Sequence, residues 1–235
     1  YIQGRGGENY ADESIFRGVD DILLTHGHFD HAQSIPQIVK ARETCKVYCT
    51  ETPAQTLLNK GVGEEQLQIF QAGDIFQIGD ITIKTYQGKH CQFDRELVEK
   101  TILSKDVIRF AGKLGGLLMA NKSFPENGET IFYELQIGER RIQVMGSMGL
   151  NPEVEYPTQA DLLVLPYQGK SQPVPTALGI IGRLQPKRLM LSHFDNAFPP
   201  MSKKVDTIPL KKALEKFYPD LPAVKPRFAK KIGIR

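Results

Sequence analysis

Residues 21–31 read D-I-L-L-T-H-G-H-F-D-H, and no other segment of the chain is as informative. Its first half, Asp21–Thr25, is a short apolar run typical of a buried strand. Its second half has the pattern H-x-H-x-D-H and comprises His26, His28, Asp30 and His31. With this composition, such a pattern arises by chance in about one of ten thousand sequences. Four ligand-type residues directly after a strand favour a metal site over core or capping roles.

Strands and helices alternate along the rest of the chain. Apolar alternation and turn residues predict strands over 46–49, 66–87, 131–137, 141–145, 162–165 and 188–192. Helical spacing predicts helices over 32–43, 52–60, the first half of 95–122 (glycine-rich thereafter), 176–184 and 210–217. These elements predict an α+β (α/β) fold with helix-covered sheets. Because there is no repeat or long linker, we expect a single domain over residues 1–235, with a helical insertion at about 95–122.

Histidine and aspartate supply the nitrogen and oxygen donors that zinc and similar divalent metals prefer. Side chains at the end of a strand project into the crevice where α/β proteins hold their ligands. The alternating His26 and His28 can reach one metal. Asp30 and His31 start the next helix and point to a second one.

This motif, following a strand, resembles the signature of the metallo-β-lactamase superfamily, and the resemblance extends from about Asp20 over nearly the whole chain. Gly88-Lys89-His90 matches the family's third ligand for the first metal, and Leu191-Ser192-His193 matches its last histidine. The resemblance implies a four-layer αββα sandwich and six metal ligands that converge on one site: His26, His28, Asp30, His31, His90 and His193. Within the superfamily, Ala160–Pro166 and the element order after His193 resemble the branch of UlaG-like sugar-phosphate lactonases.

Two features depart from the family's pattern. Where the family has an aspartate that bridges both metals, the strand over 141–145 is followed by Gly146-Ser147, and a serine hydroxyl is only a weak substitute ligand. Two divalent ions balanced by Asp30 and one hydroxide then leave a charge of about +2 in place of about +1, so we expect the second ion to bind less tightly. The second departure is the short segment before His26, from which we expect missing N-terminal strands.

Several other polar residues are candidates for supporting roles. Asp20 and Asp21 precede the first strand and are candidates for hydrogen bonds to histidine nitrogens, with ordinary turn acids as the alternative. Ser192, Asp195 and Asn196 flank His193 and are candidates for substrate or supporting contacts, or for turn formation. Asp161 and Asp195 are possible carboxylate substitutes for the bridging ligand. Cys45, Cys49 and Cys91 are expected to pack in the core.

Composition and charge narrow the class of protein. Of its residues, 40% are hydrophobic and 24% charged, which excludes disordered, collagenous and coiled-coil proteins. No apolar run is long enough to span a bilayer and three cysteines are too few for a disulfide scaffold, so we expect a cytoplasmic protein without membrane contacts. Residues 201–235 hold ten Lys/Arg and three Asp/Glu. This basic segment could face an anionic substrate or nucleic acid, or form a solvated surface.

The ligand set implies metal-assisted hydrolysis of a small, anionic ester, lactone or phosphoester by a metal-bound hydroxide. Asp30 is the expected catalytic residue, because it can orient the water and carry a proton to the leaving group. Zinc is the metal we expect, in one or two ions, with Mn²⁺, Fe²⁺ or Ni²⁺ as alternatives. The other functions that the sequence allows are a nuclease or phosphodiesterase that acts on nucleic acid, and a non-catalytic protein with a decayed dinuclear site. The sequence does not indicate an oligomeric state.

Overall fold

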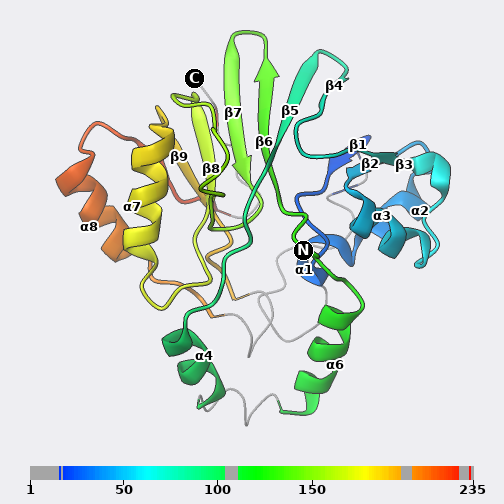
Figure 1. The fold of residues 1–235 in the computed structure, drawn as a ribbon, viewed down its shortest axis with the longest axis horizontal. Coiled ribbons are helices and arrows are strands. Elements are labelled where there is room, and N and C mark those ends of the chain that lie inside the picture. Colours follow the sequence, from blue (N-terminus) through cyan, green and yellow to red (C-terminus); the bar gives the residue numbers. More distant parts are fainter. Residues whose placement is uncertain (1–15, 17, 104–110, 197–202, 228–232, 234–235) are drawn as a thin grey trace. The chain divides into compact units, whose positions relative to one another are not determined.

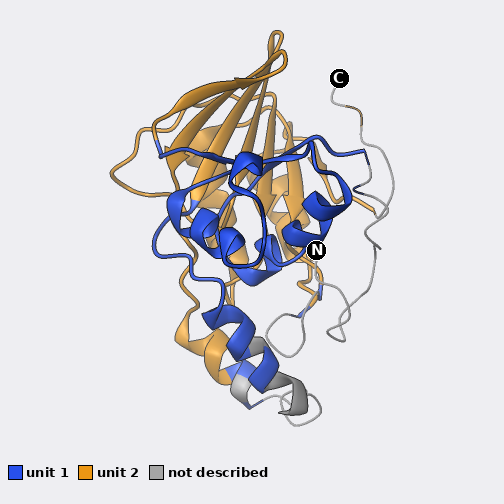
Figure 2. Cartoon of the chain, turned by 90° about the vertical axis from the view of Figure 1, so that its right-hand side faces the viewer, with its two compact units in different colours: residues 1–72, 100–130, 196–203 blue, residues 73–99, 131–195, 204–235 orange. Residues whose placement is uncertain are grey.

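The computed structural model describes residues 16, 18–103, 111–196, 203–227 and 233 (Figure 1). The chain divides into two units, which Figure 2 colours separately. Unit 1 comprises residues 1–72, 100–130 and 196–203, and unit 2 comprises residues 73–99, 131–195 and 204–235.

Unit 1 contains a parallel sheet of three strands in the order β1-β2-β3. The strands are β1 (Asp21–Leu23), β2 (Lys46–Cys49) and β3 (Leu67–Ile69). Between residues 18 and 72, the structure describes the helices α1 (Phe29–Ala32), α2 (Ile35–Ala41), α3 (Glu51–Leu58) and the short 3-10 helix η2 (Glu64–Gln66). Because successive parallel strands need a crossover, each is connected to the next through helical segments.

Alternate residues along β2 build the core of unit 1. Cys45, Val47 and Cys49 are fully buried, and they belong to one apolar cluster with Leu57 and Phe124. Burial is the main cause that raises the pKa of the Cys49 thiol to about 12, and the nearby carboxylates of unit 1 add to it. All three cysteines of the chain are free and buried, as predicted, so they are packing residues.

The helix predicted over 32–43 is two helices. α1 ends at Ala32, and α2 begins at Ile35 with Pro36 in its first turn. Proline has no N–H to donate and its ring clashes with the carbonyl four residues earlier, which here belongs to Ala32. The chain therefore turns between the two helices, and the ligand-type residues Asp30 and His31 lie on a single short turn of helix.

Unit 2 contains a seven-stranded sheet in the order β10-β9-β8-β7-β6-β5-β4. Its strands are β4 (Ile75–Ile78), β5 (Ile81–Gln87), β6 (Ile131–Ile137), β7 (Arg140–Met145), β8 (Leu162–Pro166), β9 (Leu189–Ser192) and β10 (Ala223–Val224). Strands β4 to β7 pair antiparallel, and β7 to β10 pair parallel. The predicted hairpin of β6 and β7 is confirmed, with Gly138 at a positive φ of 56° in its two-residue turn.

Helices α7 (Pro173–Leu184) and α8 (Ile208–Phe217) cover one face of this sheet (Figure 1). Leu163, Leu165 and Tyr167 alternate along β8 and its extension and pack in one cluster with Ala177 of α7 and Leu210 of α8. The period of two along a strand explains this, since every second side chain faces the helices.

The segment predicted as a helical insertion contains α4 (Arg95–Ile102) and α6 (Ala111–Lys122). α6 continues through Gly115 and Gly116, because the leucines, alanines and lysines around them are strong helix formers. Among the helices that the structure describes, none combines the length and apolar character needed to cross a bilayer. The predicted class of fold, α+β with helix-flanked sheets, is confirmed.

The packing of β8 generates a test of the core. Replacing Leu163, which is fully buried, with alanine should lower the free energy of unfolding by about 2–5 kcal/mol, because the methyl groups leave a cavity. Leu118 is 55% exposed on α6, so Leu118→Ala is the matched control. It should change the free energy of unfolding by no more than about 0.5 kcal/mol. Urea unfolding measures both, and equal effects would contradict this packing.

Candidate metal centre

The four ligand-type residues of the H-x-H-x-D-H motif gather within unit 1, directly after β1. The ring centroids of His26 and His31 lie 4.0 Å apart, and those of His26 and His28 lie 5.0 Å apart. The Nε2 atom of His31 lies 3.3 Å from a carboxylate oxygen of Asp30. These four residues therefore lie together and form a His-rich candidate metal site.

Gly27 separates His26 from His28 for a steric reason. A Cβ atom at this position would lie 2.3 Å from the carbonyl oxygen of Pro125, a distance that real Cβ atoms do not reach. The loop that carries Pro125 thus presses against the peptide between the two histidines. Only glycine allows this approach without moving the backbone.

His26 is buried, with 2% of its surface exposed, and Thr25 and Thr50 follow the neighbouring strands β1 and β2. The Thr25 hydroxyl lies 3.1 Å from His26 Nδ1, within hydrogen-bonding distance of that ring nitrogen. The Thr50 hydroxyl follows β2 at the same end of the sheet, since Leu23 pairs with Tyr48 in parallel register. It is buried and has no hydrogen-bond partner among the residues that the structure describes.

His90 belongs to unit 2 and lies three residues beyond the end of β5. Its neighbour Cys91 donates its backbone N–H to the Ser147 Oγ atom, at 2.9 Å. Ser147 lies two residues beyond the end of β7. The hydroxyl that sequence reasoning assigned as a substitute metal ligand therefore accepts a hydrogen bond from the segment that carries His90.

His193 follows β9 in the same unit and has a positive φ of 54°. This left-handed conformation costs about 1–2 kcal/mol for a residue with a side chain and is a recognised feature of functional sites. The side-chain oxygen of Gln168 accepts a hydrogen bond from His193 Nδ1 at 2.9 Å. With Nδ1 fixed as the donor, Nε2 of His193 is the nitrogen that can bind a metal.

Three contacts tie the segment after His90 to the loop after β8. The Cys91 thiol lies 3.6 Å from the carbonyl oxygen of Gly169, and Lys170 donates to the carbonyl oxygen of Gln92 at 2.6 Å. The Asp94 carboxylate accepts hydrogen bonds from the backbone N–H and the hydroxyl of Ser171. The loops that carry His90 and Gln168 are thereby joined within unit 2.

The other predicted site residues have different surroundings. Asp20 forms an ion pair with Arg42. Asp21 lies at the start of β1, at the opposite end from His26, and accepts a hydrogen bond from Tyr48. Burial of the Tyr48 phenol raises its pKa, and the nearby Asp21 carboxylate raises it further. Asp195 and Asn196 are half-buried beside His193, and their roles stay predictions.

Asp161 is not a substitute for the bridging carboxylate. It precedes β8, and it accepts hydrogen bonds from the Arg141 N–H and from Lys187. Ser147 lies at the opposite end of the neighbouring strand β7, where Ile142 pairs with Leu162. The rise of about 3.3 Å per residue separates the two ends by more than about 10 Å. Asp161 instead ties the starts of two strands, and these contacts hold the pKa of its carboxyl below the usual value.

Three polar residues were not predicted from the sequence: Thr25 beside His26, Gln168 beside His193, and Thr50 at the end of β2. The available signal for Gln168 was its place after a predicted buried strand, at the same edge as His193. Parallel strands bring their carboxyl ends to one edge, and Pro166 pairs with Ser192 in the register of β8 and β9. For Thr50 the equivalent signal was the parallel partner of the strand that leads into His26.

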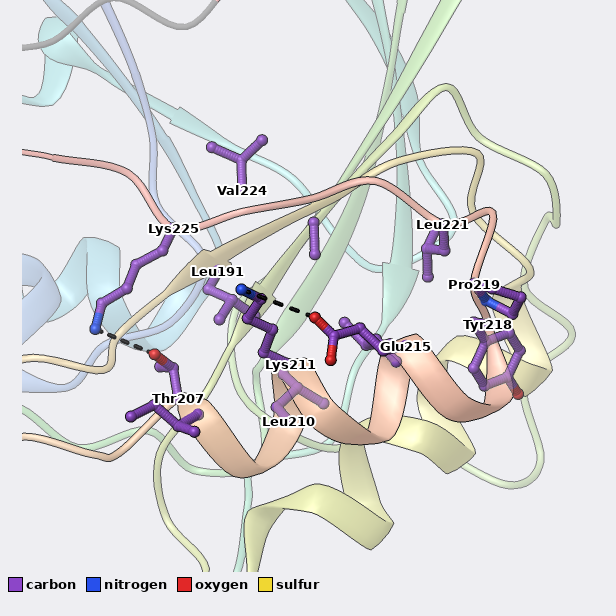
Figure 3. Close-up of a pocket in the computed structure, with 13 residues that line it drawn as sticks. Leu191, Thr207, Leu210, Lys211, Glu215, Tyr218, Pro219, Leu221, Val224 and Lys225 are labelled. Carbon is purple, nitrogen blue, oxygen red and sulfur yellow. Dashed lines mark hydrogen bonds and ion pairs between the residues drawn. The ribbon is translucent and has the colours of Figure 1, made fainter.

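A cavity of about 340 Å³ lies elsewhere in unit 2, between α8 and the strands β9 and β10 (Figure 3). Leu191, Leu210, Leu214 and Val224 contribute its apolar walls. Two polar pairs lie around it, Lys211 with Glu215 and Lys225 with Thr207. The cavity is lined by none of the ligand-type residues, so it is distinct from the candidate metal centre.

Comparisons with known proteins define the class. Residues 9–194 match the model of the beta-lactamase superfamily domain. The chain therefore belongs to the metallo-β-lactamase superfamily, as the motif indicated. It is also 31% identical over 80 residues to a UPF0173 protein of Pyrococcus abyssi, a match that covers 34% of this chain and only 37% of that relative.

Igni18 and an isothiocyanate hydrolase are two of the solved structures that share the fold. Igni18, a metallo hydrolase of the archaeon Ignicoccus hospitalis, is 16% identical with a TM-score of 0.60, covering 91% of this chain and 78% of that one. An isothiocyanate hydrolase from Delia radicum gut bacteria is 15% identical with a TM-score of 0.60, covering 95% of this chain and 79% of that one. At these identities the likeness shows the fold, while the UlaG-like branch stays a prediction.

The hydrogen bonds to the Asp94 carboxylate should make the thermal stability of the protein depend on pH. Hydrogen bonds from the backbone N–H groups of Ser171 and Leu97 lower the pKa of Asp94. A lowered pKa in the folded state stabilises the protein above the unfolded value of about 3.9, and this stabilisation is lost as the pH falls through the folded value. Asp94→Ala should therefore lower the Tm at pH 6, and the difference from wild type should shrink below about pH 4. Thermal unfolding between pH 3 and 7 measures this, with Asp220→Ala as the exposed control; a pH-independent difference would contradict the assignment.

Proposed function

We propose that this protein is a metal-dependent hydrolase, and one observation carries the proposal. In a chain of the metallo-β-lactamase superfamily, the three histidines and the aspartate of the H-x-H-x-D-H motif lie side by side just beyond the half-buried strand β1. Such clusters of nitrogen and oxygen donors are the ligands of zinc and related divalent metals.

The proposed ligands form two sets of three. His26, His28 and His90 are candidates for one metal, and Asp30, His31 and His193 for a second. That these six residues converge on one centre stays a prediction. It is supported by the resemblance of Gly88-Lys89-His90 and Leu191-Ser192-His193 to the family's ligand segments.

The donor chemistry fits a divalent metal. Three imidazoles and an open fourth corner are the usual arrangement of a catalytic zinc. The hydrogen bonds at Nδ1 of His26 and His193 orient those rings, and the His193 Nδ1 donor leaves Nε2 of that residue for coordination. The second set includes a carboxylate, which offsets part of the charge of a second ion. When bound, the metal supplies Lewis acidity and lowers the pKa of a coordinated water towards about 7.

Residues of the chain would orient the attacking water and carry a proton from it to the leaving group. Asp30 is the proposed proton carrier, because its half-buried carboxylate lies beside the imidazole of His31 and can accept a proton and release it again. Thr50, whose buried hydroxyl lacks a described partner, is available to a water or substrate oxygen at the end of β2.

We propose a small, anionic ester, lactone or phosphoester as the substrate. Lys89 is exposed beside His90 and offers a positive charge for an anionic group. Zinc is the proposed metal, with manganese, iron or nickel as alternatives, because a His/Asp donor set suits several of these ions. The proposed location is the cytoplasm.

A nuclease or phosphodiesterase that acts on nucleic acid is the second candidate. Its support is the basic segment 201–235, in which α8 carries Lys211, Lys212 and Lys216. Phosphate contacts by lysines would make its activity fall steeply with salt. A non-catalytic protein with a decayed site is the third candidate, supported by serine in place of the bridging aspartate.

Metal stoichiometry tests the role of the missing carboxylate. Without it, the two ions should bind with unequal affinity, and mild chelation should leave the wild-type protein with fewer than two metals per chain. Ser147→Asp should raise the content towards two. Elemental analysis after dialysis against a weak chelator measures both proteins. Two metals that resist chelation in the wild-type protein would mean that another carboxylate bridges them.

Activity tests the hydrolase itself. The zinc-loaded protein should hydrolyse a nitrophenyl ester, a simple lactone or a phosphodiester, and His90→Ala should lower kcat/KM by at least about 100-fold because it removes a ligand. Gln68→Ala, on the exposed face of β3, is the control and should leave kcat/KM unchanged. Tight zinc binding with no turnover of any of the three substrates would favour the non-catalytic candidate, and turnover of the phosphodiester alone would favour the nuclease.

A further inference from the structure

Ser147 is joined to the backbone of the segment that carries His90. It is 9% exposed, and its Oγ atom accepts the hydrogen bond of the Cys91 N–H at 2.9 Å. The peptide group that contains this N–H also contains the carbonyl carbon of His90. Because the peptide is planar, the bond restricts the ψ angle of His90 and hence the direction in which its side chain projects.

A second contact beside Ser147 holds the same segment. A Cβ atom at Gly149 would lie 2.5 Å from the carbonyl oxygen of Lys89. The glycine therefore allows the turn over 147–149, in which the Gly149 N–H donates to the Ser147 carbonyl oxygen, to pack against the residue before His90. Met148, 2% exposed, anchors this turn in the core of unit 2.

The far side of the segment is held by the loop after β8, through the contacts of Cys91, Gln92 and Asp94 with residues 169–171. Gln168, the first residue before those contacts, fixes the ring of His193. A continuous series of contacts thus runs from Ser147 through Cys91 and Gly169 to the second histidine of unit 2.

From these contacts we infer that Ser147 is a positioning residue for His90: its hydroxyl fixes the backbone of the His90 segment rather than binding a metal. The inference rests on the proposed function, in which His90 is a metal ligand. It also explains how a chain with serine at this position can keep His90 oriented: the hydroxyl accepts from the backbone N–H as a carboxylate would. A hydrogen bond that orients a ligand of this kind contributes about 10- to 100-fold to metal affinity.

The test compares three variants of the full chain. Ser147→Ala removes the acceptor, and Ser147→Thr keeps the hydroxyl. Thr85→Val is the matched control, because the Thr85 hydroxyl on β5 is also buried and donates to a backbone carbonyl, that of Asp74, at 2.9 Å. The first readout is the Kd of zinc, by competition with a chromophoric chelator, at the site that His90→Ala abolishes. The second is the hydrogen-exchange rate of the Cys91 amide in the metal-free protein.

We expect Ser147→Ala to weaken zinc binding by about 10- to 100-fold and to speed exchange of the Cys91 amide, with Ser147→Thr within about threefold of wild type in both. Thr85→Val should leave the zinc Kd unchanged. The positioning role would be overturned if Ser147→Ala bound zinc as tightly as the wild-type protein does. It would also be overturned if Thr85→Val weakened zinc binding as much as Ser147→Ala. A wild-type protein that binds no zinc would overturn the proposed function as well, and unaltered Cys91 exchange would show separately that the Ser147 contact is absent.

Discussion

Parallel pairing between short strands constrains where the ligand-type residues of each unit lie. Parallel strands bring their carboxyl ends to one edge, and residues beyond that edge leave the ladder with their side chains free to bind a ligand. In unit 1, β1 and β2 pair in this way, and His26 and Thr50 follow them. In unit 2, β8 and β9 do the same, and Gln168 and His193 follow them. The apolar core holds the strands in place, and the ends of the strands determine the positions of the ligand-type residues that follow them.

Beyond the strand ends, the chain is held by polar contacts and less by apolar packing. The sequence after β5 has no regular structure to hold His90, so the orientation of that residue depends on Ser147 on one side and on the loop of Gly169, Lys170 and Ser171 on the other. Individual hydrogen bonds of this kind contribute only about 0.5–1.5 kcal/mol to stability. Their value for function is geometric, because a metal ligand must be held within about 0.5 Å of its productive position.

The motif and the strands with strong apolar patterns were predictable because their signals are local. The strand over 46–49 and the hairpin of β6 and β7 agree with the sequence prediction, and so do the buried cysteines. The break between α1 and α2 was missed because helical spacing outweighed Pro36 in the prediction. The roles of Ser147 and Gln168 could not be predicted, since each depends on a partner 56 or 25 residues away. Asp161 was a plausible ligand by residue type alone, and the register of β7 and β8 excludes it.

We propose that His90 and His193 bind zinc along with the histidines of the H-x-H-x-D-H motif, and X-ray absorption at the zinc edge of the zinc-loaded protein tests this proposal. We expect a shell of nitrogen and oxygen donors at about 2.0–2.1 Å, with imidazole scattering that decreases when either His90 or His193 is replaced by alanine. A sulfur shell at about 2.3 Å, or an imidazole signal that neither substitution changes, would contradict it.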